Sequence, residues 1–197
     1  MTRLIKVGAA LLLFASCNTR SKSPEQYLDA IESDDDLHTS ISMGDIRYHM
    51  ALLPPEYFAA KYALASGKFD AGRYKDKIKE IAPYIYCTIA MSSAQDNILK
   101  YRANVYSEFQ RRLEYFTNYA SHDVVLVLND KDTITPVDYI YENNLGVSSE
   151  NKMVLVFKRP TERKKLSLLF NDRIFNNYNL KLSVASADVE QLPQIKY

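Results

Sequence analysis

Val124-Val125-Leu126-Val127-Leu128 is an unbroken run of five apolar residues. A short, continuous run of β-branched and aliphatic residues is typical of a strand inside a sheet that is covered on both faces. The next four residues, Asn129-Asp130-Lys131-Asp132, favour a hairpin turn because Asn and Asp side chains hydrogen-bond to their own backbone. We therefore expect a central strand that turns directly into an antiparallel neighbour.

The chain downstream of this turn continues as short apolar runs separated by turn residues. The expected strands span residues 133–142, 153–158, 166–170 and 180–185. In the last of them Leu180, Leu182 and Val184 alternate with polar residues, which is the pattern of a strand with one buried face. These segments predict an antiparallel meander of about five strands.

The chain upstream of the run alternates between strands and helices. Ser23-Pro24-Glu25-Gln26 is typical of a helix start, because Ser23 can cap, Gln26 completes a capping box and Pro24 occupies the first helical position. After it we expect a strand over 45–53 and a helix from Pro54-Pro55 to about residue 66, which Gly67 closes. A charged connection over 68–80, a strand around Cys87 and a long helix over 96–119 should follow.

The order of these elements predicts an α+β fold. The N-terminal half reads strand–helix–strand–helix, and the antiparallel meander follows it. We expect one α+β domain over residues 24–197, with a boundary near Ala120 as the alternative.

The first sixteen residues have the three parts of a secretory signal. Arg3 and Lys6 are basic, residues 7–15 form an unbroken apolar run, and Ala15-Ser16 are the small residues that a signal peptidase requires. Nine apolar residues are too few for a permanent membrane span, which needs about 20. A buried helix of the folded domain is the alternative, and the polar stretch over 17–23 argues against it.

Leu13-Phe14-Ala15-Ser16-Cys17 resembles the lipobox of bacterial lipoproteins, although Leu is usual where Phe14 stands. The resemblance implies that residues 1–16 are removed and that Cys17 receives a diacylglyceryl group and usually an N-acyl chain such as palmitate. Two acyl chains suffice for stable anchoring in a membrane. Residues 17–23 then form the lipidated cysteine and its tether, with a reach of roughly 20 Å when extended. Ordinary signal-peptidase cleavage, which gives a soluble periplasmic protein, is the alternative.

Two features after the cysteine bear on which membrane holds the anchor. In lipoproteins of this type an Asp after the cysteine implies retention in the inner membrane. This chain has Asn18 at that position, which favours the outer membrane. The acidic run that exports some Bacteroidetes lipoproteins to the cell surface directly follows the cysteine, whereas Asp34-Asp35-Asp36 comes seventeen residues later. The resemblance therefore implies the periplasmic face of the outer membrane.

The layout of the whole chain resembles that of small uncharacterised lipoproteins of Bacteroidetes. The matching features are the opening helix Tyr27-Leu28-Asp29-Ala30-Ile31-Glu32, the strand–Pro–helix unit over 46–66 and the strands from Val124 onward. This resemblance implies a class of protein and a cell compartment. It implies no activity, because those lipoproteins are uncharacterised.

The charge of the chain is nearly balanced. Without Arg3 and Lys6 the mature chain has 23 basic residues against 24 acidic ones, a net charge of −1. A nucleic-acid-binding domain needs basic residues clustered on one face, so we expect no nucleic-acid partner. Lipid on Cys17 leaves Cys87 without a disulfide partner. Alternation over 84–91 places Cys87 on the apolar face of its strand, where a thiol is an inert core residue.

No segment has the spacing of a catalytic, metal or cofactor motif. Ser121-His122-Asp123 has the residues of a triad, but triad members come from separate parts of a fold, and these three favour a cap and a turn. His38 and His49, like His122, stand in unrelated contexts without the i, i+4 pair of a zinc helix. The acidic run over 34–36 favours a solvated loop over a calcium site. We expect no metal, no cofactor and no enzymatic activity.

The densest basic cluster joins two expected strands. The ordinary interpretation of this cluster is a solvated hairpin loop. The more specific interpretation is a surface that contacts anionic lipid headgroups, lipopolysaccharide or an acidic partner, with a binding free energy of up to ~1 kcal/mol per basic residue. Its basic residues are Lys158, Arg159, Arg163, Lys164 and Lys165.

Two functions of different classes remain open. The one we favour is a non-enzymatic envelope lipoprotein, which touches membrane lipid through Cys17 and binds an envelope protein through its sheet and loops. The other is a lipid-anchored periplasmic hydrolase without a recognisable motif. A pocket lined by two or more titratable side chains in mutual contact would favour the hydrolase.

Overall fold

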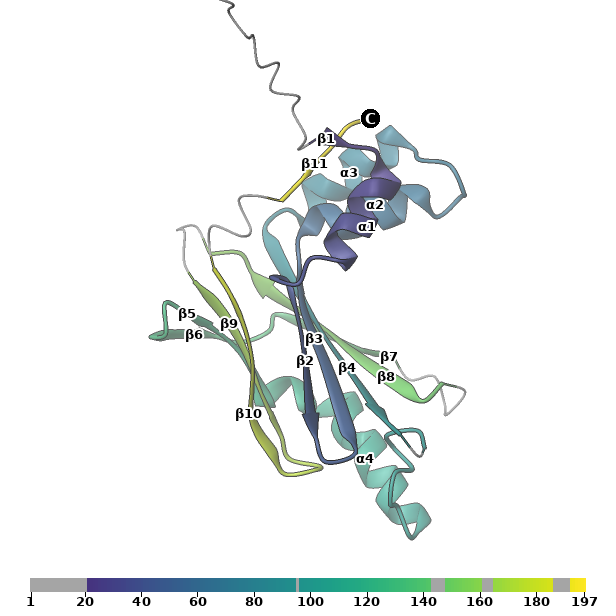
Figure 1. The fold of residues 1–197 in the computed structure, drawn as a ribbon, viewed down its shortest axis with the longest axis vertical. Coiled ribbons are helices and arrows are strands. Elements are labelled where there is room, and N and C mark those ends of the chain that lie inside the picture. Colours follow the sequence, from purple (N-terminus) through teal and green to yellow (C-terminus); the bar gives the residue numbers. More distant parts are fainter. Residues whose placement is uncertain (1–20, 95, 143–147, 161–164, 186–191) are drawn as a thin grey trace, which may run out of the picture.

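The computed structural model describes residues 21–94, 96–142, 148–160, 165–185 and 192–197. In this part of the chain two antiparallel sheets pack against each other. Three helices lie at one end of the sheets and a fourth lies at the other end (Figure 1).

The larger sheet has five strands in the order β2-β3-β4-β8-β7, and every neighbouring pair is antiparallel. Its strands are β2 (His38–Met43), β3 (Ile46–Leu53), β4 (Tyr84–Ser93), β7 (Asp138–Glu142) and β8 (Glu150–Lys158). The central strand β4 contains Cys87, which is buried together with Ile85 and Ile89 as the alternation predicted.

The smaller sheet has the order β10-β9-β5-β6. Its strands are β5 (Val124–Leu128), β6 (Asp132–Ile134), β9 (Leu166–Asp172) and β10 (Asn177–Val184). The apolar run is therefore an interior strand, as expected. Only the face with Val124, Leu126 and Leu128 is buried, whereas Val125 and Val127 are partly exposed.

The apolar faces of the two sheets form one core. The ring of Tyr48 in β3 meets the ring of Phe170 in β9 edge-on, with centroids 6.3 Å apart. The core cluster includes residues on both sides of Ala120. At the far end, α4 (Tyr106–Asn118) packs on β7, where the rings of Phe116 and Tyr141 stack at 5.7 Å. The short 3₁₀ helix η1 (Ala120–Asp123) then leads into β5.

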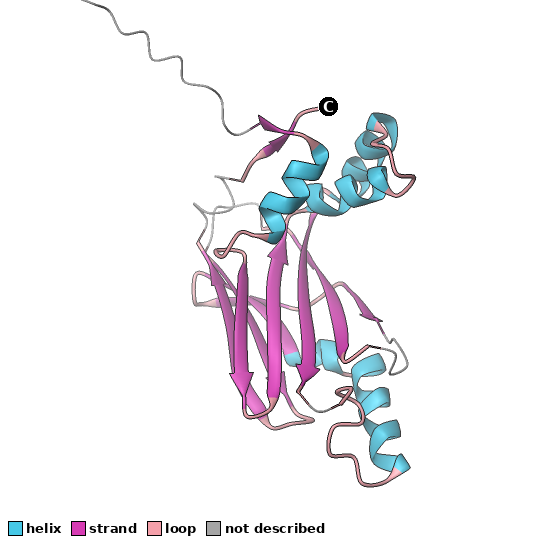
Figure 2. Ribbon diagram, turned by 45° about the vertical axis from the view of Figure 1, so that its right-hand side comes forward, coloured by secondary structure: helices cyan, strands magenta, loops and turns pink. Residues whose placement is uncertain are grey.

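The helices α1 (Pro24–Glu32), α2 (Pro55–Leu64) and α3 (Ala71–Ile81) lie together beyond the other end of the sheets (Figure 2). There β1 (Ser21–Lys22) and β11 (Gln194–Ile195) form a parallel pair, which brings both ends of the described chain together. None of the helices in the described residues has the length and apolar character that crossing a membrane requires.

The α+β class is confirmed, and so is the capping box at the start of α1. Ser23 Oγ accepts from the N–H of Gln26, and the Gln26 side chain accepts from the N–H of Ser23. The C-terminal strands are antiparallel as expected. They are divided between the two sheets, because β7 and β8 join β4 in the larger one.

Three local predictions are wrong. The charged connection over 68–80 contains α3, whose charges cover its exposed side while Tyr74 and Ile81 are buried. The long helix begins only at Tyr106, because a turn occupies residues 98–102 and Arg102 has a φ of 51°. The segment 133–142 contains two strands in different sheets, since Pro136 between them has no N–H for a strand ladder.

Candidate functional site

The candidate site is a hollow of about 380 Å³ at the end of the sheets opposite α1, α2 and α3. It forms where the β2–β3 turn, the turn before α4 and the β9–β10 turn meet. We call it the distal pocket. Its polar and aromatic lining consists of Asp45, Tyr101, Arg102, Glu108, Arg112, Phe175 and Asn177.

Asp45 is placed by the tight β2–β3 turn, in which Gly44 has a φ of 61° that suits glycine. Its Oδ2 accepts from the hydroxyl of Tyr101 and from Nη2 of Arg102, each at 2.8 Å. Partial burial, together with the hydrogen bond to Asp45, raises the pKa of Tyr101. The phenol therefore stays protonated and acts as a donor.

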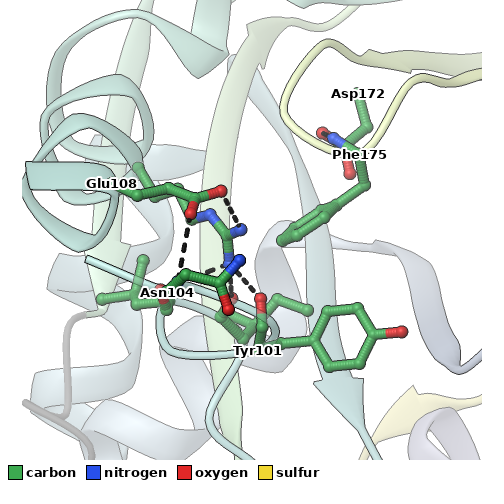
Figure 3. A network of polar contacts seen from close by, with 8 residues as sticks. Tyr101, Asn104, Glu108, Asp172 and Phe175 are labelled. Carbon is green, nitrogen blue, oxygen red and sulfur yellow. Dashed lines mark hydrogen bonds and ion pairs between the residues drawn. The ribbon is translucent and has the colours of Figure 1, made fainter. Parts of the chain in front are cut away.

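The guanidinium of Arg112 joins three residues labelled in Figure 3, namely Tyr101, Glu108 and Phe175. Its guanidinium is buried, donates from Nη1 to the carbonyl of Tyr101 and from Nη2 to Glu108 at 2.7 Å, and lies 5.0 Å from the ring centroid of Phe175. The hydrogen bond from Arg112 lowers the pKa of Glu108. The hydrogen bond of Arg112 to the carbonyl of Tyr101 thus fixes the turn before α4 against that helix.

A second polar network lies behind Phe175. Asn177 donates to the hydroxyl oxygen of Tyr48 at 2.8 Å, and that hydroxyl donates to Oδ2 of Asp172 at 2.5 Å. The other oxygen of Asp172 accepts from the N–H groups of Ile174 and Phe175. Burial raises the pKa of Asp172. The network ties β3 to the β9–β10 turn and so sets the position of Phe175.

The distal pocket has the general form that would favour a hydrolase, because its titratable side chains touch one another. Its charges cancel in pairs, however, as Arg102 binds Asp45 and Arg112 binds Glu108. Of the described residues that line it, none is a serine, cysteine or histidine. Such a lining can present hydrogen-bond donors, acceptors and an aromatic face to a ligand, and its described residues contain no serine or cysteine nucleophile paired with a histidine.

Ser121-His122-Asp123 lies in η1 and makes a turn, as expected. Nδ1 of His122 contacts the carbonyl of Tyr119 at 3.1 Å, while Asp123 binds Arg173 Nε and the hydroxyl of Tyr115, each at 2.8 Å. The side chains of His122 and Asp123 therefore bind separate partners, and the three consecutive residues do not form a triad.

His38 and His49 are not in unrelated contexts, and this prediction is wrong. Nδ1 of His38 and Nε2 of His49 lie 3.2 Å apart, because β2 and β3 are antiparallel neighbours. Strand β2 was missing from the predicted elements, so the pairing could not be foreseen. In the part of the chain that the structure describes, no group of three or more His, Cys, Asp or Glu side chains could hold a metal ion.

The structure describes only some of the remaining predicted site residues. Lys158 and Arg159 are exposed, whereas Lys165 binds Asp130 at 3.0 Å. Cys17, Arg163 and Lys164 lie outside the described residues, so lipidation and the anionic-surface contact stay predictions. Cys87 is a free, buried thiol whose pKa is raised by burial, which makes it a poor nucleophile.

Sequence reasoning missed the distal pocket as a site. Tyr101 and Arg112 lie in the segment 96–119 that was expected to be one long helix, and Arg112 was the one residue that could have indicated a site. An arginine on the buried side of a helix requires a partner, and here the partners are Glu108 and the carbonyl groups of the preceding turn.

No family model and no curated protein matches the chain. Among solved structures, the crystal structure of a DUF4426 family protein from Pseudomonas aeruginosa PAO1 is similar to this chain. The match covers 75% of this chain and 90% of the DUF4426 chain. The sequence identity is 8% and the TM-score is 0.38, a likeness too distant to assign a fold family or a function.

Proposed function

We propose that this protein is a lipid-anchored lipoprotein of the cell envelope that acts as a non-enzymatic binding module, with the distal pocket as its recognition site. The observation that carries the proposal is the placement of the two ends of the molecule. The described chain begins at Ser21 beside α1, and the distal pocket lies at the opposite end of the sheets (Figure 1).

The short tether would determine which end of the domain lies near the bilayer. Three residues separate Cys17 from Ser21, which corresponds to a reach of about 14 Å at full extension. Lipid on Cys17 would therefore hold the α1–α3 end near the bilayer and point the distal pocket away from it. A pocket in that position can meet a protein or ligand that is not in the membrane. Asn18 and the distance to the acidic run support the periplasmic face of the outer membrane.

The chemistry of the distal pocket supports binding over hydrolysis. The carboxylates of Asp45 and Glu108 are each bound to an arginine, so neither is free to take a proton from a substrate. The exposed Arg102, the phenol of Tyr101 and the ring of Phe175 offer a charged group, a donor and an apolar face. An envelope protein that presents an acidic or amide-rich segment would suit this combination.

Anchoring is tested by replacing the cysteine. Cys17→Ser should abolish incorporation of radiolabelled palmitate and move the protein from the membrane fraction to the periplasmic fraction. The control is Cys87→Ser, which removes the other cysteine and should leave both the label and the membrane location unchanged. Retention of the label in Cys17→Ser would contradict the anchoring.

Recognition is tested by co-purification from membranes in mild detergent, with mass spectrometry of the bound proteins. Arg102→Glu reverses an exposed charge of the distal pocket and should remove the partner. Lys131→Glu makes the same charge change in the β5–β6 turn and should retain it. Recovery of the wild-type protein alone, or hydrolysis of ester or peptide substrates by the pure protein, would contradict a non-enzymatic binding module.

A further inference from the structure

We propose that the α1–α3 end of the protein binds the anionic headgroups of a phospholipid bilayer through basic and aromatic residues of α2, α3 and the C-terminus. The orientation rests on the anchoring proposed above, and the surface chemistry stands by itself. We call this surface the headgroup patch. It consists of Lys22, Tyr62, Arg73, Lys75, Lys196 and Tyr197.

The headgroup patch includes Lys22 and Lys196, which lie where the described chain begins. The N–H of Lys196 donates to the carbonyl of Lys22 at 2.8 Å, so the first and last described segments form one surface (Figure 2). The next residue, Tyr197, packs on α3, where its ring lies 5.1 Å from that of Tyr74 and 5.4 Å from that of Phe69. With Cys17 lipidated, the tether would hold Ser21, beside Lys22 of this surface, within about 14 Å of the lipid.

The cations of the patch are held by rings. The guanidinium carbon of Arg73 lies 4.5 Å from the ring centroid of Tyr62, and Nζ of Lys75 lies 5.6 Å from that of Tyr197. In the described part of the chain neither cation is paired with a carboxylate. Both cations therefore remain available to phosphate groups, which Arg binds in a bidentate manner.

The two tyrosines have the exposure that a membrane interface requires. Tyr62 is 47% exposed and Tyr197 is 54% exposed, although both are large apolar side chains. Tyrosine is enriched at the level of the lipid headgroups because its ring is apolar and its hydroxyl is polar. Aromatic rings that carry cations on their faces match a layer of phosphates above an apolar interior.

The helices at this end differ in charge, so an anionic bilayer would attract one and repel another. Helix α3 has four basic residues against two acidic ones, whereas α1 has three acidic residues and no basic one. An anionic bilayer would attract α3 and repel α1. Arg159, of the cluster predicted to contact an anionic surface, donates its N–H to the carbonyl of Pro83 just beyond α3. The attraction thus extends toward the exposed Lys158 and Arg159.

The proposal is tested with the mature chain without lipid, residues 17–197 with Cys17→Ser, so that the headgroup patch is measured without the anchor. Binding to vesicles rich in phosphatidylglycerol is compared with binding to phosphatidylcholine vesicles by co-sedimentation at low ionic strength. We expect clear preference for the anionic vesicles, with loss of binding as salt is added. Each basic residue near the surface contributes about fivefold to the binding constant.

The test variant is Arg73→Glu with Lys75→Glu, which should weaken binding to the anionic vesicles by about 25-fold or more. The matched control is Lys100→Glu with Arg111→Glu, an equal charge change at exposed positions near α4, which should bind like the wild type. Thermal unfolding of both variants shows whether they are folded. Equal loss in the two variants, or equal binding of the wild type to both kinds of vesicle, would overturn the proposal.

Failure of the anchoring and failure of the headgroup patch give different results. Absence of palmitate label with preserved vesicle preference would contradict the anchor and retain the patch. A labelled protein whose lipid-free form ignores anionic vesicles would retain the anchor and contradict the patch. A thiol-reactive fluorophore at Ser21→Cys, an exposed position beside Lys22 that is not one of the patch residues, is compared with one at Tyr106→Cys at the far end. Buried Cys87 does not compete for the label. Quenchers attached to lipid headgroups should quench the label at position 21 only.

Discussion

Asp172 of β9 joins the two sheets through its hydrogen bond with Tyr48 of β3. It is fully buried and accepts from the hydroxyl of Tyr48 and from the N–H groups of Ile174 and Phe175. Asp172→Ala leaves these donors without an acceptor, and each buried unpaired donor costs about 1–3 kcal/mol. We expect the free energy of unfolding, measured in urea, to fall by about 3 kcal/mol or more.

The control for this variant is Asp35→Ala, at an exposed position on the loop after α1. Surface substitutions of this kind change the free energy of unfolding by less than about 0.5 kcal/mol. An equally small effect of Asp172→Ala would show that the buried network does not hold the sheets together.

The paired histidines form a chain of hydrogen bonds with a defined direction. His38 Nε2 donates to the carbonyl of Ile31 at 2.9 Å, so Nδ1 of a neutral His38 is an acceptor and faces Nε2 of His49. Nδ1 of His49 then accepts from the hydroxyl of Ser40 at 3.1 Å. Every ring nitrogen has a partner while both rings are neutral, and adding a proton removes an acceptor.

This arrangement predicts acid sensitivity. Burial, and then the neighbouring His38, lower the pKa of His49 in the folded state from its ordinary value of 6.5. The unfolded chain therefore binds the proton first as the pH falls, so stability is present above about pH 6.5 and is lost below it. We expect the free energy of unfolding to decrease between about pH 7 and pH 5, and to decrease less in His49→Asn. The control His122→Asn should keep the wild-type slope, and equal slopes in all three proteins would contradict this role.

At the scale of single elements, the start of α3 gives the clearest prediction. Oδ1 of Asp70 accepts from the N–H groups of Gly72 at 2.8 Å and Arg73 at 3.0 Å. Replacing an N-cap aspartate with alanine costs about 1 kcal/mol. Asp70→Ala should lower the free energy of unfolding by that amount, whereas Asp76→Ala, at an exposed position in the same helix, should have little effect. Similar values for the two variants would show that the cap does not stabilise α3.

Elements with local signals could be predicted from the sequence. Ser23, Pro24 and Gln26 marked the start of α1, and the continuous apolar run over 124–128 marked an interior strand. Helix α3 was missed because its charged residues outnumber its apolar ones, and only the spacing of Tyr74, Ile78 and Ile81 indicates its buried side. Strand β2 was missed because its edge position leaves it mostly polar.

The distal pocket could not be predicted from the sequence because it depends on contacts between distant segments. Asp45 meets Tyr101 and Arg102 across more than fifty residues of chain. Those contacts depend on the turn over 98–102, where a continuous helix had been expected. The residues of the pocket were visible, but their proximity depends on how the two sheets pack.

At the scale of the whole molecule, the pairing of β1 with β11 closes the chain at the α1–α3 end. Removing residues 194–197 deletes β11 and takes the ring of Tyr197 away from α3. Lys22 then loses its pairing, and we expect trypsin to cleave after it roughly tenfold faster, as for a local opening made easier by about 1.4 kcal/mol. Mass spectrometry of the timed digest measures the rate.

Cleavage after Lys131, in the β5–β6 turn far from β11, is the internal control and should keep its wild-type rate. A general increase at both sites would indicate global destabilisation instead. An unchanged rate after Lys22 would show that the short strand pair does not protect the start of the chain.

The same strand pair has a consequence for how the protein can be handled. Since the last residue lies beside the first described one, an epitope or affinity tag added after Tyr197 would lie against the bilayer of an anchored protein, shielded from antibodies and resins. A tag inserted in the β5–β6 turn would stand clear of the membrane. Detection that depends on the insertion point would then report, in intact cells, which way the molecule faces.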